Sequence, residues 1–201
     1  MIIKRFNVTL NFNIDKGKFL NILDRVKICL FTNKINLTHT GEHKMVNIGQ
    51  KNDTFRYARA VCYIKVKPEI IKHIKSDASI KGDILRISEI AGISAAKKTS
   101  DLIPLCHQIN LNTVKIKIHL EEESCNLPLS LEMKSDGNNK IYIESYVESC
   151  SKTGVEMEAM VSVSIAALTL YDMCKSVDKS IEISEIKLIE KFGGKSGHYK
   201  I

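Results

Sequence analysis

Residues 153–177 read TGVEMEAMVSVSIAALTLYDMCKSV, and this stretch decides the fold. It carries no charge from Ala159 to Tyr171, and it is rich in Ala, Met and Leu, which favour helices. We therefore expect a long helix from Gly154 to Ser176 that is buried along its middle. The apolar part is too short to cross a bilayer, so we expect no transmembrane helix.

Segments that alternate apolar and polar residues lie on both sides of this helix, as half-buried strands do. The predicted strands are residues 55–67, 113–121, 140–149 and 181–190, the last with one slip in its alternation. A long polar hairpin connection over 122–139 joins the second strand to the third.

Two shorter helices are predicted between the first and second strands. Pro68 favours a helix start before residues 69–75, and Asp83 is a suitable N-cap for a helix over 84–98. Residues 99–110 are expected to form a loop.

The predicted order is β-α-α-β-β-α-β. With the first two helices counted as one crossover, this order indicates an α+β fold of the ferredoxin-like, split β-α-β kind. Its four-stranded antiparallel sheet has helices packed on one face. We expect small residues on the other face and a second copy of the chain as its cover.

The composition is that of an ordinary folded protein, with 44% apolar and 26% charged residues among 201. Of the net charge of +7, residues 1–44 hold +5, so the remaining chain is nearly neutral. A nucleic-acid interface needs clustered basic residues, and an RNA-binding sheet needs aromatic residues at set positions on two strands. Neither pattern is evident, so we expect no nucleic-acid partner and no membrane partner.

The six cysteines are scattered without a C-x-x-C pair, which is typical of a reduced, intracellular protein. Residues 1–44 are rich in Asn, Ile and Lys and have no acidic residue before Asp15. They are interpreted either as an organellar presequence or as a simple extension, so the location is cytoplasmic or organellar. Residues 45–201 are expected to form the working domain.

Four segments carry candidate chemistry, and each also has a purely structural interpretation. Lys81-Gly82-Asp83 is a turn that could simply be solvated. In DLIPLCH (101–107), His107 could be a histidine bonded to a backbone carbonyl, and zinc would need more ligands than this loop offers. KFGGKSG (191–197) offers either an anion-binding loop or a disordered tail.

The long helix is the fourth segment, and it carries acidic residues near both ends. Asp172 and Lys175 lie three residues apart, as an ion pair would. Glu158 and Asp172 lie within about 40° of one helix face but about 21 Å apart along the axis, too far for one small pocket. An antiparallel second copy could bring opposite ends together, so we expect sites shared between subunits. Taken together, the four segments indicate acid/base chemistry on a phosphorylated small molecule.

Three motifs give the chain a specific resemblance: IAGISAAKKTSDLIPLCH (90–107), TGVEMEAMVSVSIAALTLYDMCKSVDK (153–179) and GGKSG (193–197). Over about residues 45–200 the chain resembles the molybdenum-cofactor biosynthesis protein C (MoaC) family of cyclic pyranopterin monophosphate synthases. The resemblance implies a ferredoxin-like subunit, a hexamer made of three dimers, and active sites at the dimer interface.

The implied reaction converts a 3',8-cyclised dihydro-GTP into cyclic pyranopterin monophosphate and releases pyrophosphate. It needs no redox cofactor and no metal held by the protein, although Mg²⁺ could accompany the substrate triphosphate. The resemblance gives three residues catalytic roles: Asp172, Lys81 and Lys175. It places nine others in substrate binding: Leu105, Cys106, His107, Met157, Glu158, Lys191, Glu156, Arg56 and Lys195. We expect Lys81 to be the general acid and Asp172 to orient Lys175.

The chain departs from the family pattern beside these motifs. The departures are Gln108 after the histidine, Glu89 before IAGI, Asn47 near the start of the likeness, and Phe192 before GGKSG. They leave a second interpretation, a catalytically impaired oligomeric scaffold of the same fold.

Overall fold

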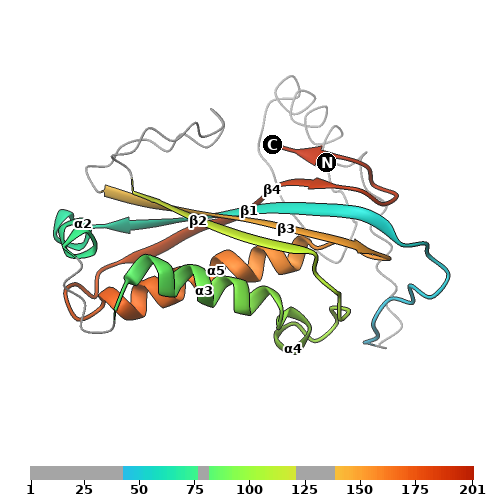
Figure 1. Cartoon of the computed structure of the whole chain (residues 1–201), viewed down its shortest axis with the longest axis horizontal. Coiled ribbons are helices and arrows are strands. Elements are labelled where there is room, and N and C mark those ends of the chain that lie inside the picture. Colours follow the sequence, from blue (N-terminus) through green and yellow to red (C-terminus); the bar gives the residue numbers. More distant parts are fainter. Residues whose placement is uncertain (1–42, 77–81, 121–138) are drawn as a thin grey trace, which may run out of the picture. The chain divides into compact units, whose positions relative to one another are not determined.

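The computed structural model describes residues 43–76, 82–120 and 139–201 (Figure 1). Lys81, residues 1–42 and nearly all of the expected hairpin connection at 122–139 lie outside the described residues. The predictions made for them therefore stay predictions.

An antiparallel sheet forms the centre of the described fold. Its strands are β1 (Thr54–Val66), β2 (Thr113–Leu120), β3 (Asn139–Ser151), β4 (Glu182–Phe192) and β5 (Tyr199–Lys200). They lie in the order β2-β3-β1-β4-β5, and every pair is antiparallel. The four predicted strands are confirmed, and the prediction of a four-stranded sheet is corrected to five. Two residues are too few to show alternation, which is why β5 gave no signal.

The helices begin and end close to the predicted positions. They are α2 (Pro68–Lys75), α3 (Ile84–Ala96), α4 (Thr99–Leu102) and α5 (Glu156–Cys174). Asp83 caps α3, because its side chain accepts a hydrogen bond of 3.0 Å from the backbone N–H of Arg86. The short helix α4 occupies part of the segment that was expected to be a loop. α5 is shorter than expected at both ends, and at its N-terminal end Val155 has non-helical dihedral angles.

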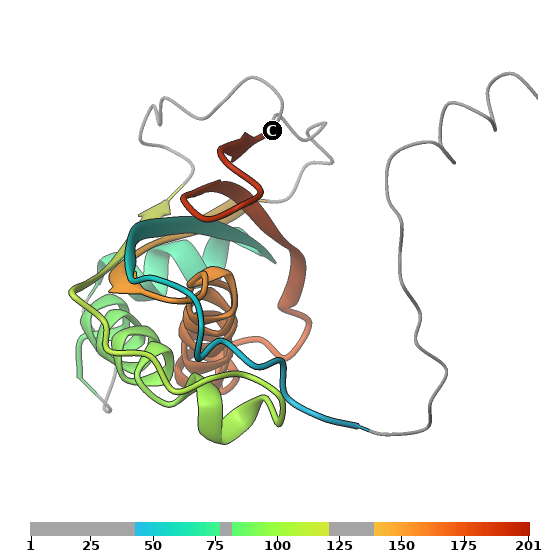
Figure 2. The ribbon, with the colours of Figure 1, turned by 90° about the vertical axis from the view of Figure 1, so that its right-hand side faces the viewer.

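The core lies between the sheet and helices α3 and α5, which run side by side under one face (Figures 1 and 2). Ala58, Ala60, Cys62 and Ile64 of β1 point into this layer and are fully buried. Gly92 of α3 lies against the backbone carbonyl of Ser162, so the two helices pack closely. α5 is long and apolar enough to cross a membrane by length and composition alone, but more than half of it is buried in this core.

The opposite face of the sheet carries larger side chains than expected. Tyr57, Arg59 and Tyr63 alternate with the small residues of β1, so the small residues face the helices instead. The prediction of small residues on the open face was therefore wrong. The alternation of residues along a strand does not by itself show which of the two alternating sets faces the core.

Candidate functional site

A cavity of about 310 Å³ lies at the N-terminal end of α5. Three chain segments meet there: the stretch before β1, the connection from α4 to β2, and the start of α5. Its lining includes six of the nine predicted binding residues, namely Leu105, Cys106, His107, Glu156, Met157 and Glu158. The cavity thus brings together residues that lie far apart in the sequence, and their roles in substrate binding stay predictions.

Glu158 is the most unusual group in this cavity. It is only 3% exposed, and burial raises the pKa of its carboxyl group to about 7, with a smaller contribution from Glu156. Burial and the nearby Glu158 also raise the pKa of the Cys106 thiol. Near neutral pH, Glu158 is therefore a carboxyl group that can hold or give up a proton.

Glu156 lies two residues before Glu158 in the chain and has a cationic partner. The ammonium of Lys191 lies 3.0 Å from its Oε1 and donates a hydrogen bond of 2.6 Å to the hydroxyl of Ser196. Lys191 belongs to β4, and its cross-strand neighbour Ala58 faces the helices, so the lysine points toward the start of α5. The predicted lysine is therefore at the edge of the same site.

The loop that follows Lys191 packs closely against Arg56. The guanidinium donates to the carbonyl oxygens of Ser151 (2.9 Å) and Lys152 (3.3 Å). Gly193 and Gly194 have positive φ angles, and a Cβ on Gly194 would collide with this guanidinium. Arg56 thus lies between the end of β3, to which it bonds, and this loop, and Lys195 is exposed on the loop.

His107 makes the contact with a backbone carbonyl that its structural interpretation predicted, and its role in substrate binding stays a prediction. It is half-buried at the cavity wall, and its Nε2 lies 2.7 Å from the backbone carbonyl oxygen of Val46. Sequence reasoning missed six other lining residues: Val46, Ile48, Lys51, Ile109, Thr153 and Gly154. Residues 46–51 follow neither helix nor strand periodicity; the only available signal was the MVNIGQK stretch at the start of the family likeness.

Asp172 and Lys175 lie at the other end of α5. Their side chains form the predicted ion pair, with 2.6 Å between Oδ1 and Nζ, and both are about half exposed. The hydrogen bond to Asp172 raises the pKa of Lys175. Asp172 thus orients Lys175, as expected, and also favours its charged form within one chain.

The structure does not bring the two ends of α5 together. Between Glu158 and Asp172 the helix is continuous, which separates them by about 21 Å along the axis. The predicted site residues therefore form two groups in one chain: the cavity group with Lys191, and the Asp172–Lys175 pair.

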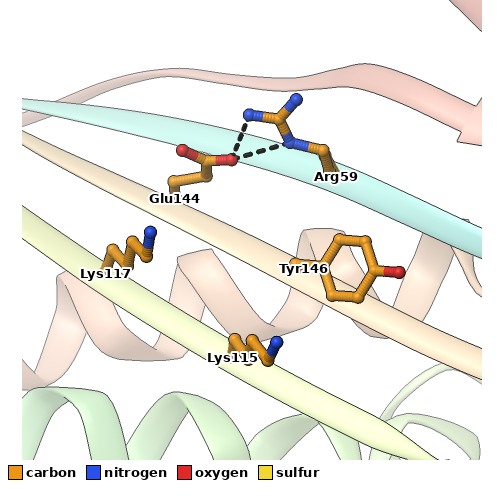
Figure 3. A pocket seen from close by; sticks show the side chains of 5 residues that line it. All are labelled: Arg59, Lys115, Lys117, Glu144 and Tyr146. Carbon is orange, nitrogen blue, oxygen red and sulfur yellow. Dashed lines mark hydrogen bonds and ion pairs between the residues drawn. The ribbon is translucent and has the colours of Figure 1, made fainter. Parts of the chain in front are cut away.

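A second hollow of about 210 Å³ lies on the opposite face of the sheet (Figure 3). Arg59, Lys115, Lys117, Glu144 and Tyr146 line it, and Arg59 bonds to Glu144. The Tyr57 ring beside it stacks on Tyr146 and Phe192, at centroid distances of 5.7 and 5.6 Å. These rings stack on one another. In RNA-binding sheets, by contrast, aromatic rings have free faces on which bases stack.

The departures from the family pattern lie outside the cavity lining. Phe192 alternates with Lys191 and joins the ring stack on the far face of the sheet. Asn47 accepts a hydrogen bond of 2.8 Å from the N–H of Gly49, and Gln108 is exposed. Glu89 lies in α3, and none of the four departures takes a place in the cavity wall.

The described cysteines, Cys62, Cys106, Cys150 and Cys174, are free thiols. Within the described ranges, no group of three or more His, Cys, Asp or Glu residues is placed to hold a metal ion.

Comparison with known proteins gives the same family as the motifs. The model of the MoaC family matches residues 45–194. A relative from Syntrophomonas wolfei subsp. wolfei, named cyclic pyranopterin monophosphate synthase, is 46% identical over 167 residues. The match covers 82% of this chain and 98% of the relative. Because the match includes both ends of α5 and the cavity segments, the chain belongs to the MoaC family.

Proposed function

We propose that this chain is a cyclic pyranopterin monophosphate synthase of molybdenum cofactor biosynthesis. It converts the 3',8-cyclised dihydro-GTP to cyclic pyranopterin monophosphate and releases pyrophosphate. The observation that carries the proposal is the single cavity that joins Leu105, Cys106 and His107 to Glu156, Met157 and Glu158. The close relative with this name, matched over nearly its whole length, supports it.

A complete site requires two copies of the chain. One outer face of α5 carries Met157, Ser164 and Leu168 and continues to Asp172 and Lys175. Met157 is 39% and Leu168 is 54% exposed, so this face offers apolar surface that a second copy could bury. Antiparallel packing of two such faces about an axis near Ile165 would set Glu158 of each copy beside Asp172 of the partner subunit. Three such dimers form the hexamer.

In the combined site, each group of residues has a separate task. Lys81 gives and takes protons while carbon–nitrogen bonds open and reclose, and Asp172 holds Lys175 in place. Lys191, Arg56 and Lys195 supply positive charge for the triphosphate and the leaving pyrophosphate. No redox cofactor takes part, and any Mg²⁺ arrives with the substrate triphosphate.

The proposal also includes a ferredoxin-like fold for the subunit and a location for the protein in the cell. The order β2-β3-β1-β4 of the long strands supports a ferredoxin-like subunit, with β5 added at one edge. The protein acts inside the cell, in the cytoplasm or, if residues 1–44 are a presequence, in an organelle.

The test is an assay with the cyclised dihydro-GTP as substrate. We expect cyclic pyranopterin monophosphate and pyrophosphate in equal amounts, and a loss of at least about 100-fold in kcat for Asp172→Asn. The control is Asp178→Asn, because Asp178 bonds to Lys67 and Ser180 near the same end of the fold. Absence of product from the wild-type protein would favour the impaired scaffold.

A further inference from the structure

The hairpin formed by β4 and β5 carries site residues, but its backbone has few bonds to hold it closed. β5 has two residues, which pair with Glu190 and Lys191, and Ile201 adds one backbone hydrogen bond of 3.1 Å to Ile189. The turn between the strands contains three glycines with positive φ angles, and glycine loses more freedom on folding than other residues. So short a strand is marginal by itself. A side-chain contact that closes the hairpin should therefore decide how well the turn is placed.

His198, the residue before β5, makes such a contact with Glu190 of β4. Its Nε2 lies 2.9 Å from Oε1 of Glu190, whose side chain is only 10% exposed. Glu190 is itself fixed to β1, because Arg59 and Tyr57 each donate a hydrogen bond of 3.0 Å to it. Burial works against the charge of Glu190, but the bonds from His198, Arg59 and Tyr57 outweigh burial and lower its pKa. Glu190 is therefore a charged and firmly held partner for His198.

Phe192 reinforces this contact on the open face of the sheet. The rings of Phe192 and His198 meet edge to face, with 6.0 Å between their centroids and 66° between their planes. Phe192 in turn stacks on Tyr57 of β1. This departure from the family pattern thus gives His198 an aromatic ring to pack against.

The other side of the hairpin faces the start of α5. Lys191 follows Glu190 in β4, so its side chain leaves the opposite face of the sheet, where its ammonium lies 3.0 Å from Glu156. The same ammonium donates a hydrogen bond of 2.6 Å to Ser196, which lies in the turn two residues before His198. Release of His198 from Glu190 would therefore loosen the turn, and Ser196 would no longer hold Lys191.

We propose that His198 is a positioning residue of the synthase. Its bond to Glu190 closes the hairpin and so keeps Ser196 against Lys191, the lysine that meets the phosphate groups of the substrate. The inference deepens the proposed function and rests on it, since the phosphates are those of the proposed substrate. His198 lies on the face of the sheet away from the cavity, and it acts through Ser196 and Lys191.

Steady-state kinetics of the full chain with the cyclised dihydro-GTP test the proposal. His198→Ala should raise KM by about 5–10-fold, the effect of about one hydrogen bond, and change kcat by less than about twofold. The reason is that the triphosphate is charged before the reaction begins, so a misplaced Lys191 weakens the binding of substrate and transition state alike. His198→Gln keeps an N–H donor for Glu190 and should restore most of the affinity. If His198 only stabilised the fold, loss of folded molecules would lower the apparent kcat and leave KM unchanged.

Ser196→Ala tests whether His198 acts through the turn. It removes the hydroxyl that holds Lys191, so His198→Ala should add less than about twofold to the KM of a Ser196→Ala chain. His119→Ala is the matched control, because His119 contacts the Tyr142 ring on the same face but in β2, at the other edge of the sheet. It should keep the KM of the wild type.

Three kinetic results would contradict the inference: an unchanged KM in His198→Ala, an equal rise in His198→Gln, or independent effects of the changes at 196 and 198. Calorimetric titration with pyrophosphate separates the inference from the proposed function. We expect the affinity for pyrophosphate to fall in His198→Ala and to recover in His198→Gln. If the wild type shows this pattern but does not turn over the cyclised substrate, the proposed function alone is wrong. If pyrophosphate binds all variants equally or binds none of them, the inference is wrong.

Discussion

At the scale of single residues, contacts between residues close in the sequence were easier to predict than contacts between residues far apart in it. The ion pair of Asp172 with Lys175 and the N-cap of Asp83 follow from spacing within one helix, and both are present. The contact of His107 with the Val46 carbonyl joins segments that share no local pattern, so spacing could not reveal it. The elevated pKa of Glu158 likewise comes from burial by three segments, which a single helix pattern does not report.

Glu158 should make the stability of the fold depend on pH. Its pKa is raised in the folded state from 4.5 to about 7, so its contribution is fully present below pH 4.5 and is lost as pH rises through 7. Glu158→Gln does not titrate. Relative to the wild type, its free energy of unfolding should therefore rise by roughly 3 kcal/mol from pH 4.5 to pH 8.

Urea denaturation across this pH range measures the difference. Glu148→Gln is the control, because Glu148 bonds to Tyr146 on the face of the sheet away from the cavity, and it should follow the wild type. A Glu158→Gln curve parallel to the wild-type curve would mean that the carboxyl group is already charged in the folded protein.

At the scale of elements, the periodic segments were predicted well and the irregular ones were not. The four long strands and the helices α2 and α3 show apolar periodicity, whereas α5 was predicted from its long uncharged run of residues that favour helices. The slip noted in the last strand corresponds to the irregular pairing of β4 with β1, where Glu185 has a positive φ angle of 47°. The helix α4 and strand β5 have four and two residues, so neither is long enough to show a period.

The contact of α3 with α5 should be sensitive to one methyl group. A Cβ on Gly92 would lie 3.0 Å from the Ser162 carbonyl oxygen and 3.2 Å from the Cβ of Ala166. Backbone and a short side chain cannot move aside cheaply, so we expect Gly92→Ala to lower the free energy of unfolding by about 1–3 kcal/mol. Ser94→Ala, on the exposed side of α3, should change it by less than about 0.5 kcal/mol. Chemical denaturation compares the two, and an equally stable Gly92→Ala variant would contradict the close packing.

At the scale of the whole molecule, the central claim is that two chains complete each site. The cavity with Lys191 and the Asp172–Lys175 pair lie at opposite ends of α5, so these two groups are separate within one chain. The sequence could predict this separation from helix geometry alone, because rise per residue sets the length of a continuous helix. The sequence could not predict how one copy packs on another, because the surfaces involved have no regular spacing of residues like that of a helix.

The most direct test mixes two inactive variants, Asp172→Asn and Lys191→Ala, refolded together in equal amounts. A site built from two chains is intact when it takes Asp172 from one variant and Lys191 from the other, which random mixing gives in about one quarter of sites. We therefore predict that synthase activity returns to about one quarter of the wild-type value. If the mixture stays as inactive as either variant alone, each site belongs to a single chain, and the account is wrong.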